Sequence, residues 1–155
     1  MPATKLKQFL DSQGIRYVSI SHSISYTAQE VAASAHVRGK EMAKTVIVRI
    51  DGRLAMAVLP ASPKVDLNLL KEGIGARQVE LAAESDFQEA FPGCELGAMP
   101  PFGNLYGMEV YVDPSLSKDK EIAFNACSHR ELIRMAYGDF EGLVRPKVVA
   151  LARTN

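Results

Sequence analysis

Two β-rich runs separated by an Asp-Gly pair constrain the fold more than any other feature of the sequence. The runs span Thr45 to Ile50 and Leu54 to Leu59, and Asp51-Gly52 lies between them. Aspartate followed by glycine suits a tight hairpin turn, because both turn residues need a positive φ angle. The sequence therefore predicts a β-hairpin in this part of the chain.

Helices and strands alternate along the rest of the sequence. Thr27 and Glu30 form a capping box that predicts a helix through about Ala35, and Asp66 is suited to cap another. The other predicted helices cover 4–12, 67–72, 85–91 and a short segment from about 139; the other predicted strands cover 15–21, 78–81, 109–112, 121–124, 131–136 and 147–151. This order predicts an α/β (α+β) fold around a mixed, curled sheet, and it leaves the strand order open.

The size and charge of the chain bound what it can do. The 155 residues, 47% of them apolar, are enough for one core, and no linker divides them, so we expect one domain over 1–155. Lys plus Arg (18) equals Asp plus Glu (18), so a contact with RNA would have to be local. No signal peptide or apolar run of about 18 residues is present, which predicts a cytoplasmic protein without a membrane partner.

Common templates for cofactor and metal sites do not fit the sequence. It contains no phosphate-binding P-loop, dinucleotide-binding Gly-x-Gly-x-x-Gly, nucleophile elbow or His-Glu-x-x-His. His22, His36 and His129 are scattered, and Cys94 and Cys127 form no Cys-x-x-Cys pair. We therefore expect no metal and no cofactor, and in a chain of this size we expect no dependence on a disulfide.

Lys44 is the first candidate for a functional side chain. It opens the apolar strand Lys44-Thr-Val-Ile-Val after a polar connection. A lysine at the start of a strand can reach into a pocket and bind a phosphate or a carbonyl oxygen. The alternative is a solvated lysine, which the residue type alone favours; Lys40 and Lys64 would then be equally good candidates.

The second candidate is a loop with almost no charge, Gly97-Ala-Met-Pro-Pro101-Phe-Gly103. Glycine lets a backbone amide approach a ligand closely, and consecutive prolines stiffen the chain between the glycines. Such a loop can present amides to a carbonyl oxygen or an oxyanion. A plain connection between a helix and a strand is the alternative.

The third candidate is Asn125-Ala-Cys-Ser-His129, which follows the apolar Phe124. Small residues and a histidine at a strand end suit a compact substrate pocket. Cys127 and His129 could form a nucleophile pair, but no orienting acid is evident, and a packed thiol is favoured.

Taken together and in this order, the three segments resemble the YbaK/ProX family of editing domains. Lys44 matches the family's lysine, Gly97 to Pro101 matches its Gly-x-x-x-Pro loop, which continues into Phe102-Gly103, and the run ending at His129 resembles its Asn-Ala-Gly-Ser-His. The resemblance continues through Asp113-Pro-Ser-Leu116, Ile122-Ala-Phe-Asn-Ala126, Asp139-Phe140 and Leu143-Val-Arg-Pro146, and it spans nearly the whole chain.

The resemblance implies a mixed, barrel-like sheet and an aminoacyl-tRNA deacylase that needs no metal. The resemblance implies that the enzyme hydrolyses the ester between a small amino acid and the 3′ acceptor end of a misacylated tRNA for proline. It also implies prolyl-tRNA synthetase as a partner, and no DNA. The implied catalytic residues are Lys44, Gly97, Pro101 and His129. The implied substrate-binding residues are Met99, Pro100, Phe102, Gly103, Asn125, Ala126, Cys127 and Ser128.

One departure from the family pattern concerns Cys127, which stands where the family has glycine. Its side chain would narrow the pocket or turn a backbone amide away, so the amino acid removed stays open. Members of the family are also expected to recruit a group of the substrate in place of a catalytic base. The competing hypothesis is a non-catalytic module that binds tRNA or a synthetase.

Overall fold

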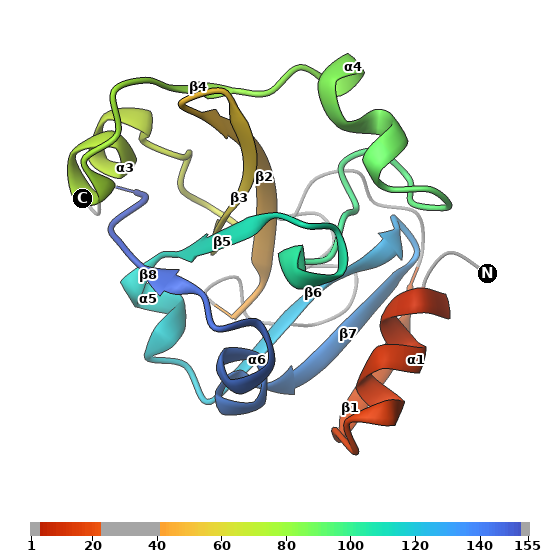
Figure 1. Ribbon diagram of the computed structural model, residues 1–155. Coiled ribbons are helices and arrows are strands. Elements are labelled where there is room, and N and C mark those ends of the chain that lie inside the picture. Colours follow the sequence, from red (N-terminus) through yellow and green to blue (C-terminus); the bar gives the residue numbers. More distant parts are fainter. Residues whose placement is uncertain (1–3, 23–40, 153–155) are drawn as a thin grey trace.

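The computed structural model describes residues 4–22 and 41–152 (Figure 1). In chain order its elements are α1 (Thr4–Ser12), β1 (Tyr17–Ser21), β2 (Ala43–Ile50), β3 (Arg53–Pro60), α3 (Leu67–Ile74), β4 (Val79–Leu81), α4 (Glu84–Phe87), 3-10 segments at Gln88–Ala90 and Gly103–Leu105, β5 (Glu109–Val112), α5 (Pro114–Ser117), β6 (Glu121–Ser128), β7 (Glu131–Ala136), α6 (Tyr137–Val144) and β8 (Lys147–Val148). The helix predicted at 27–35 lies outside the described residues.

Two sheets form the framework. One has the antiparallel order β1-β7-β6, and the other has the order β4-β2-β3-β5-β8, in which β3, β5 and β8 are parallel neighbours. The prediction of an α/β fold with a mixed sheet is therefore confirmed. Neither sheet closes on itself within the described part of the chain, so the curled, barrel-like detail is not confirmed.

The central hairpin is formed by β2 and β3, as predicted. Asp51 and Gly52 have φ angles of 47° and 86°, the left-handed conformation that a turn of this kind requires. The Asp51 carboxylate accepts hydrogen bonds from the backbone N–H groups of Arg77 (3.0 Å) and Gln78 (2.8 Å). These bonds attach the turn to the segment that leads into β4.

The two sheets meet where β2 begins. Met42 forms a parallel bridge with Ala123 of β6, and the Ala123 N–H donates to the Glu41 carbonyl oxygen at 2.9 Å. The start of β2 therefore lies beside β6, whereas the hairpin turn lies at the opposite end of β2. This contact brings together segments about 80 positions apart in the sequence.

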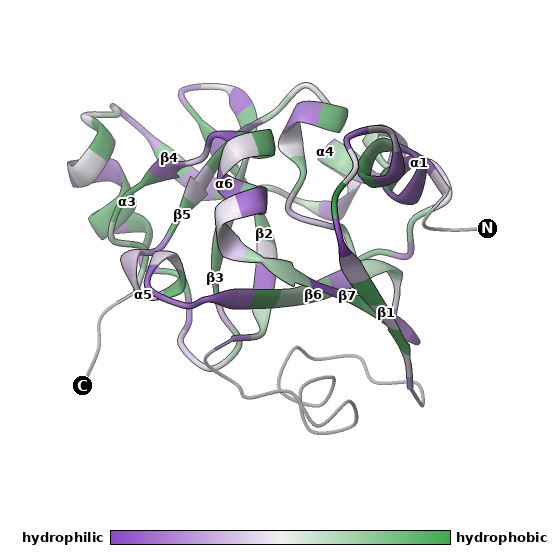
Figure 2. Cartoon of the chain, turned by 90° about the horizontal axis from the view of Figure 1, so that it is seen from below, coloured by the Kyte–Doolittle hydropathy of each residue, from purple (hydrophilic) through white to green (hydrophobic). Residues whose placement is uncertain are grey.

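Apolar residues cover both faces of the five-stranded sheet. On one face, Ala43 and Ile47 of β2 pack in a core with Phe102, Phe124 and other residues that connects the two sheets. On the other face, Val46 and Val48 pack with Leu70 of α3. The alternation follows from the strand geometry, in which successive side chains point to opposite faces. In Figure 2 both hydrophilic and hydrophobic residues appear along α1, whose buried residues are Leu6 and Leu10.

Several boundaries differ from the predicted ones. The helix expected at 85–91 is shorter, because α4 ends at Phe87 and a 3-10 turn follows before Pro92. The strand expected at 121–124 continues to Ser128, and α5, capped by the Asp113 carboxylate on the Ser115 N–H, was not predicted. Among the described helices, none combines the length and the apolar composition needed to cross a membrane.

Candidate active site

The loop that begins at Cys94 lies against the end of β6. The Glu95 N–H donates to the Cys127 carbonyl oxygen, and the Cys127 N–H donates to the Ala98 carbonyl oxygen, both at 2.9 Å. The pairing of β6 with β7 shifts its register between Asn125 and Ser128, which leaves this backbone available to the loop. Two segments that the sequence singled out separately are thus in direct contact. We call this contact between 94–98 and 125–129 the junction.

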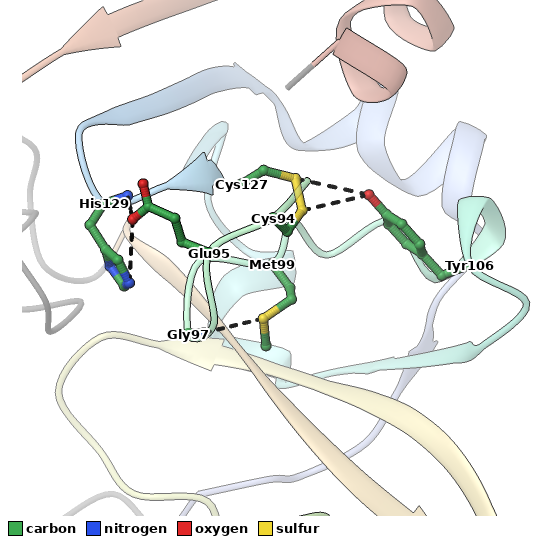
Figure 3. The surroundings of a disulfide bond; sticks show 7 residues. All are labelled: Cys94, Glu95, Gly97, Met99, Tyr106, Cys127 and His129. Atoms are coloured by element: carbon green, nitrogen blue, oxygen red, sulfur yellow. Dashed lines mark hydrogen bonds and ion pairs between the residues drawn. A yellow bond between two sulfur atoms is a disulfide. The ribbon is translucent and has the colours of Figure 1, made fainter. Parts of the chain in front are cut away.

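A disulfide between Cys94 and Cys127 closes the junction (Figure 3). The expectation that Cys127 is a packed thiol is therefore wrong, and Cys127 has no thiol with which to act as a nucleophile in this state. Cys127 also has a φ of 64°, a conformation that glycine adopts easily and other residues rarely. The glycine that the resemblance places at this position thus has a physical reason.

His129 holds the loop from the side opposite the disulfide, as Figure 3 shows. Its ring Nε2 lies 2.9 Å from the Leu96 carbonyl oxygen, and its backbone N–H donates to the Glu95 carboxylate at 3.2 Å. Nε2 is also 3.9 Å from that carboxylate. With only 7% of the residue exposed, His129 is engaged with the loop through both its ring and its backbone.

Gly97 lies beside the His129 ring. Its φ is 86°, and a Cβ added there would lie 3.4 Å from His129 Cε1. The Gly97 N–H points to the Met99 sulfur at 3.3 Å. A thioether is a weak acceptor, so an ester carbonyl oxygen would be a better partner for this N–H group.

Lys44 lies at the start of β2, where β2 runs beside β6. Met42 and Ala123 form an isolated parallel bridge, and Lys44 and Asn125 each lie two residues further along the chain from it. Burial, and secondly the charge of Lys64, lowers the pKa of Lys44 from its ordinary value. Asn125 Oδ1 is buried without a hydrogen-bond partner in the described part of the chain. A half-buried cation and an unsatisfied amide thus each follow the bridge at which the two sheets meet.

The remaining predicted residues are enclosed in the protein interior. They are Met99, Pro100, Pro101, Phe102, Gly103 and Ala126, all of them buried. Phe102 is fully buried against the rings of Phe124 (5.5 Å between centroids) and Phe140 (5.6 Å), so any contribution it makes to the site is through packing. The Ser128 hydroxyl accepts from the Arg130 N–H at 3.1 Å.

Sequence reasoning missed three participants in the junction. Cys94 is 33 residues from its partner, and Glu95 sits among ordinary surface residues in the sequence. Tyr106 places its hydroxyl 3.9 Å from the sulfurs of both Cys94 and Cys127. A signal existed only for the disulfide, since the chain has two cysteines and no other use for them was apparent.

A cavity of about 860 Å³ lies at the hairpin end of β2 and extends to Tyr106, whose hydroxyl lies beside the disulfide. Ile50, Asp51, Arg53, Tyr106 and Tyr111 are among its lining residues. None of the site residues predicted from the sequence is among them. Within residues 4–22 and 41–152, no three His, Cys, Asp or Glu side chains are grouped so that they could hold a metal ion.

Comparison with solved structures establishes the class of fold. A crystal structure of a protein described provisionally as a trans-editing enzyme for prolyl tRNA synthetase matches with a TM-score of 0.83 and 19% sequence identity, covering 99% of this chain and 98% of that one. The model of the aminoacyl-tRNA editing domain family matches residues 22–143. The chain therefore belongs to the aminoacyl-tRNA editing domain family.

Two curated relatives narrow the comparison. The multifunctional Ser/Thr-tRNA deacylase ProXp-y of Escherichia coli K12 is 27% identical over 158 residues, which cover 97% of this chain and 92% of the relative. A proline–tRNA ligase of Bacillus mycoides is 25% identical over 100 residues, or 64% of this chain and 17% of the ligase. The resemblance inferred from the three segments is confirmed, and the chain is an aminoacyl-tRNA deacylase that acts on misacylated tRNA.

Proposed function

We propose that this deacylase removes a small amino acid from the 3′ end of a tRNA for proline, and that the reaction takes place at the junction beside Lys44. The observation that carries the proposal is the docking of the glycine-containing loop on the end of β6, next to the start of β2. Small residues at Gly97, Ala98 and Ser128 let the backbone approach a substrate closely.

The proposed reaction is hydrolysis of the ester that links the amino acid to the terminal ribose. A water oxygen adds to the carbonyl carbon, the carbonyl oxygen becomes an oxyanion, and the bond to the ribose oxygen then breaks. The water's protons end on the ribose hydroxyl and on the carboxyl group, which ionises. The Gly97 N–H is the proposed donor to the oxyanion, because its present partner is only the Met99 sulfur.

Lys44 is the proposed electrostatic group of the site. Its ammonium, half-buried at the start of β2, would bind the terminal phosphate or the ester carbonyl oxygen more strongly than a solvated lysine would. Lys64 is exposed and close enough for its charge to lower the pKa of Lys44. Two neighbouring cations favour a phosphate as the group bound there.

His129 is proposed as a positioning residue. Its ring is engaged with the Leu96 carbonyl oxygen and its backbone with Glu95, so its role is to hold Gly97 in place. Asn125, whose buried Oδ1 lacks a partner among the described residues, is the proposed acceptor for the ammonium group of the amino acid. Pro101 stiffens the loop that carries Gly97.

A synthetase is the proposed partner in the cell. The relation to a proline–tRNA ligase supports an editing role beside prolyl-tRNA synthetase. The formal net charge of zero gives little long-range attraction to tRNA, so delivery by a synthetase would raise the rate of encounter. Adding prolyl-tRNA synthetase should increase deacylation at low tRNA concentration and should not change kcat.

The test of the proposal is a panel of tRNAs for proline charged with alanine, serine, threonine, cysteine or proline. Release of the labelled amino acid is measured under single-turnover conditions with the wild-type protein, and the rate without enzyme is subtracted. We expect rapid release of at least one small noncognate amino acid and slow release of proline. Retained tRNA binding with no release from any member of the panel would contradict the proposal.

A further inference from the structure

The Cys94–Cys127 disulfide joins the two segments of the junction at the point where their backbones are hydrogen bonded (Figure 3). We infer that this disulfide is reversible and that it holds the deacylation site in position. It is opened and closed by thiol–disulfide exchange with small-molecule thiols and disulfides, and we call it the clip. The inference rests on the proposed function of the junction. It gives the enzyme two states that differ in how firmly Gly97 is held.

The positive φ angle of Cys127 explains why a disulfide is needed at this position. With a φ of 64°, Cys127 adopts a conformation that is unfavourable for any residue with a Cβ. The disulfide and the two backbone hydrogen bonds, to Glu95 and Ala98, hold it there. Once the disulfide is reduced, a return to negative φ would turn the Cys127 N–H and carbonyl groups away from the loop, and Gly97 would lose its support.

The position of the two sulfurs determines the order of the exchange. Cys94 is partly exposed, whereas Cys127 is 2% exposed, so an incoming thiolate reaches Cys94. The thiolate attacks the Cys94 sulfur, the bond to Cys127 breaks, and Cys127 leaves as a thiolate that takes a proton from solvent. A second thiol then attacks the mixed disulfide, which leaves two protein thiols and one small-molecule disulfide, a transfer of two electrons. Glutathione disulfide reverses both steps.

Tyr106 is placed to assist this exchange. Its hydroxyl lies 3.9 Å from both sulfurs. Burial raises the pKa of Tyr106, so the hydroxyl keeps its proton and can donate it in a hydrogen bond to the departing Cys127 thiolate. Tyr106→Phe should therefore slow reduction of the disulfide by about threefold, the effect of one weak hydrogen bond.

The experiment compares the oxidised and reduced protein. Wild type is oxidised with glutathione disulfide and desalted, and one half is reduced with tris(2-carboxyethyl)phosphine, which has no thiol to attack the ester of the substrate. Thiol titration should find no free thiol in the oxidised protein and two in the reduced protein. We expect reduction to lower kcat for deacylation by about tenfold, with KM changed less, and reoxidation to restore it.

Two variants separate the disulfide from the side chain. Cys94→Ser should show the kcat of the reduced wild type under both conditions, since no disulfide opposes the return of Cys127 to a negative φ. Cys127→Gly should also be independent of redox conditions but faster than Cys94→Ser, because glycine adopts this φ without a disulfide. Equal kcat for oxidised and reduced wild type, or full activity in Cys94→Ser, would overturn the inference.

Amide hydrogen exchange tests, without any tRNA, whether the disulfide stabilises the junction. The amides of Glu95 and Cys127 are hydrogen bonded across the junction, so reduction should weaken their protection while amides in β3 stay protected. Unchanged protection, or cysteines that glutathione disulfide cannot oxidise, would overturn the clip. If neither redox form deacylates any tRNA, the proposed function fails, and the exchange data still test the clip.

Discussion

Asp51 and Cys127 share a positive φ although neither is glycine, and their surroundings differ in every other respect. Asp51 lies in an exposed hairpin turn, where its own carboxylate accepts hydrogen bonds from the backbone of residues 77 and 78. Cys127 is 2% exposed and is held by a disulfide and by two backbone hydrogen bonds to the loop that contains Cys94, Glu95 and Ala98. One conformation is thus stabilised by turn chemistry, the other by tertiary contacts.

Under the proposed function, this difference separates a structural end of β2, the hairpin turn, from a functional one, which begins at Lys44. The hairpin end needs only residues that suit a turn, and a change there is expected to affect stability. The end that begins at Lys44 lies beside β6, so a change there is expected to affect catalysis. Matched substitutions at the two ends can test this division.

The largest contrast is expected from the two cations. Lys44→Ala should lower kcat/KM for deacylation about 10²- to 10³-fold, because it removes the charge proposed to bind the phosphate or carbonyl oxygen. Arg53→Ala, at the exposed hairpin end, should leave it within about twofold, since surface substitutions are usually small in effect. Circular dichroism should be native for both variants. Normal turnover by Lys44→Ala would remove Lys44 from the mechanism.

A second contrast uses two glycines with the same φ of 86°, Gly97 and Gly52. Gly97→Ala puts a Cβ on a left-handed backbone, so the loop is expected to relax away from this φ and displace the proposed oxyanion donor, which should lower kcat about tenfold. Gly52→Ala meets no atom within 4 Å and should cost only stability, about 1–2 kcal/mol. Chemical unfolding and single-turnover assays measure the two effects. Equal loss of activity in both variants would contradict the division.

A third prediction concerns the turn alone. Asp51→Ala removes the acceptor for two backbone N–H groups and should lower the free energy of unfolding by about 1 kcal/mol. Deacylation by the folded variant should equal that of the wild type. A large loss of activity with unchanged stability would indicate that the hairpin end, with its 860 Å³ cavity, takes part in the reaction.

The smallest effect is a shift of the pH profile. The pKa of Lys44 is lowered, so its ammonium loses its proton at a lower pH than an ordinary lysine does. Activity that depends on this charge should therefore fall as the pH rises through the lowered pKa. In Lys44→Arg the side chain stays charged over this pH range, so a plot of log kcat/KM against pH should no longer show the fall. The same fall in Lys44→Arg would assign it to the amino group of the substrate.

Local chemistry made much of the framework predictable. The Asp51-Gly52 turn, the Asp66 cap of α3 and the runs of β5 and β7 depend on neighbouring residues, and the structure has them near the predicted places. The sheet order could not be read from spacing, because it depends on which strands meet across long separations. The bridge between Met42 and Ala123 is such a contact.

The candidate site was predictable only in part for the same reason. The loop and the Asn125–His129 run were recognised as separate segments. Their contact depends on the tertiary structure, which the spacing in the sequence does not determine. The left-handed conformation of Cys127 gave no local signal, since cysteine is not a turn residue; only the glycine of the family pattern hinted at it. The disulfide that accompanies this conformation joins positions 33 residues apart.

The most direct test of the proposed site is a crystal structure with a nonhydrolysable, amide-linked alanyl-adenosine 5′-monophosphate. We expect the analogue to bind at the junction, with its carbonyl oxygen within hydrogen-bond distance of the Gly97 N–H and its phosphate beside Lys44. Binding instead in the cavity at the hairpin end, between Arg53 and Tyr111, would contradict the proposal.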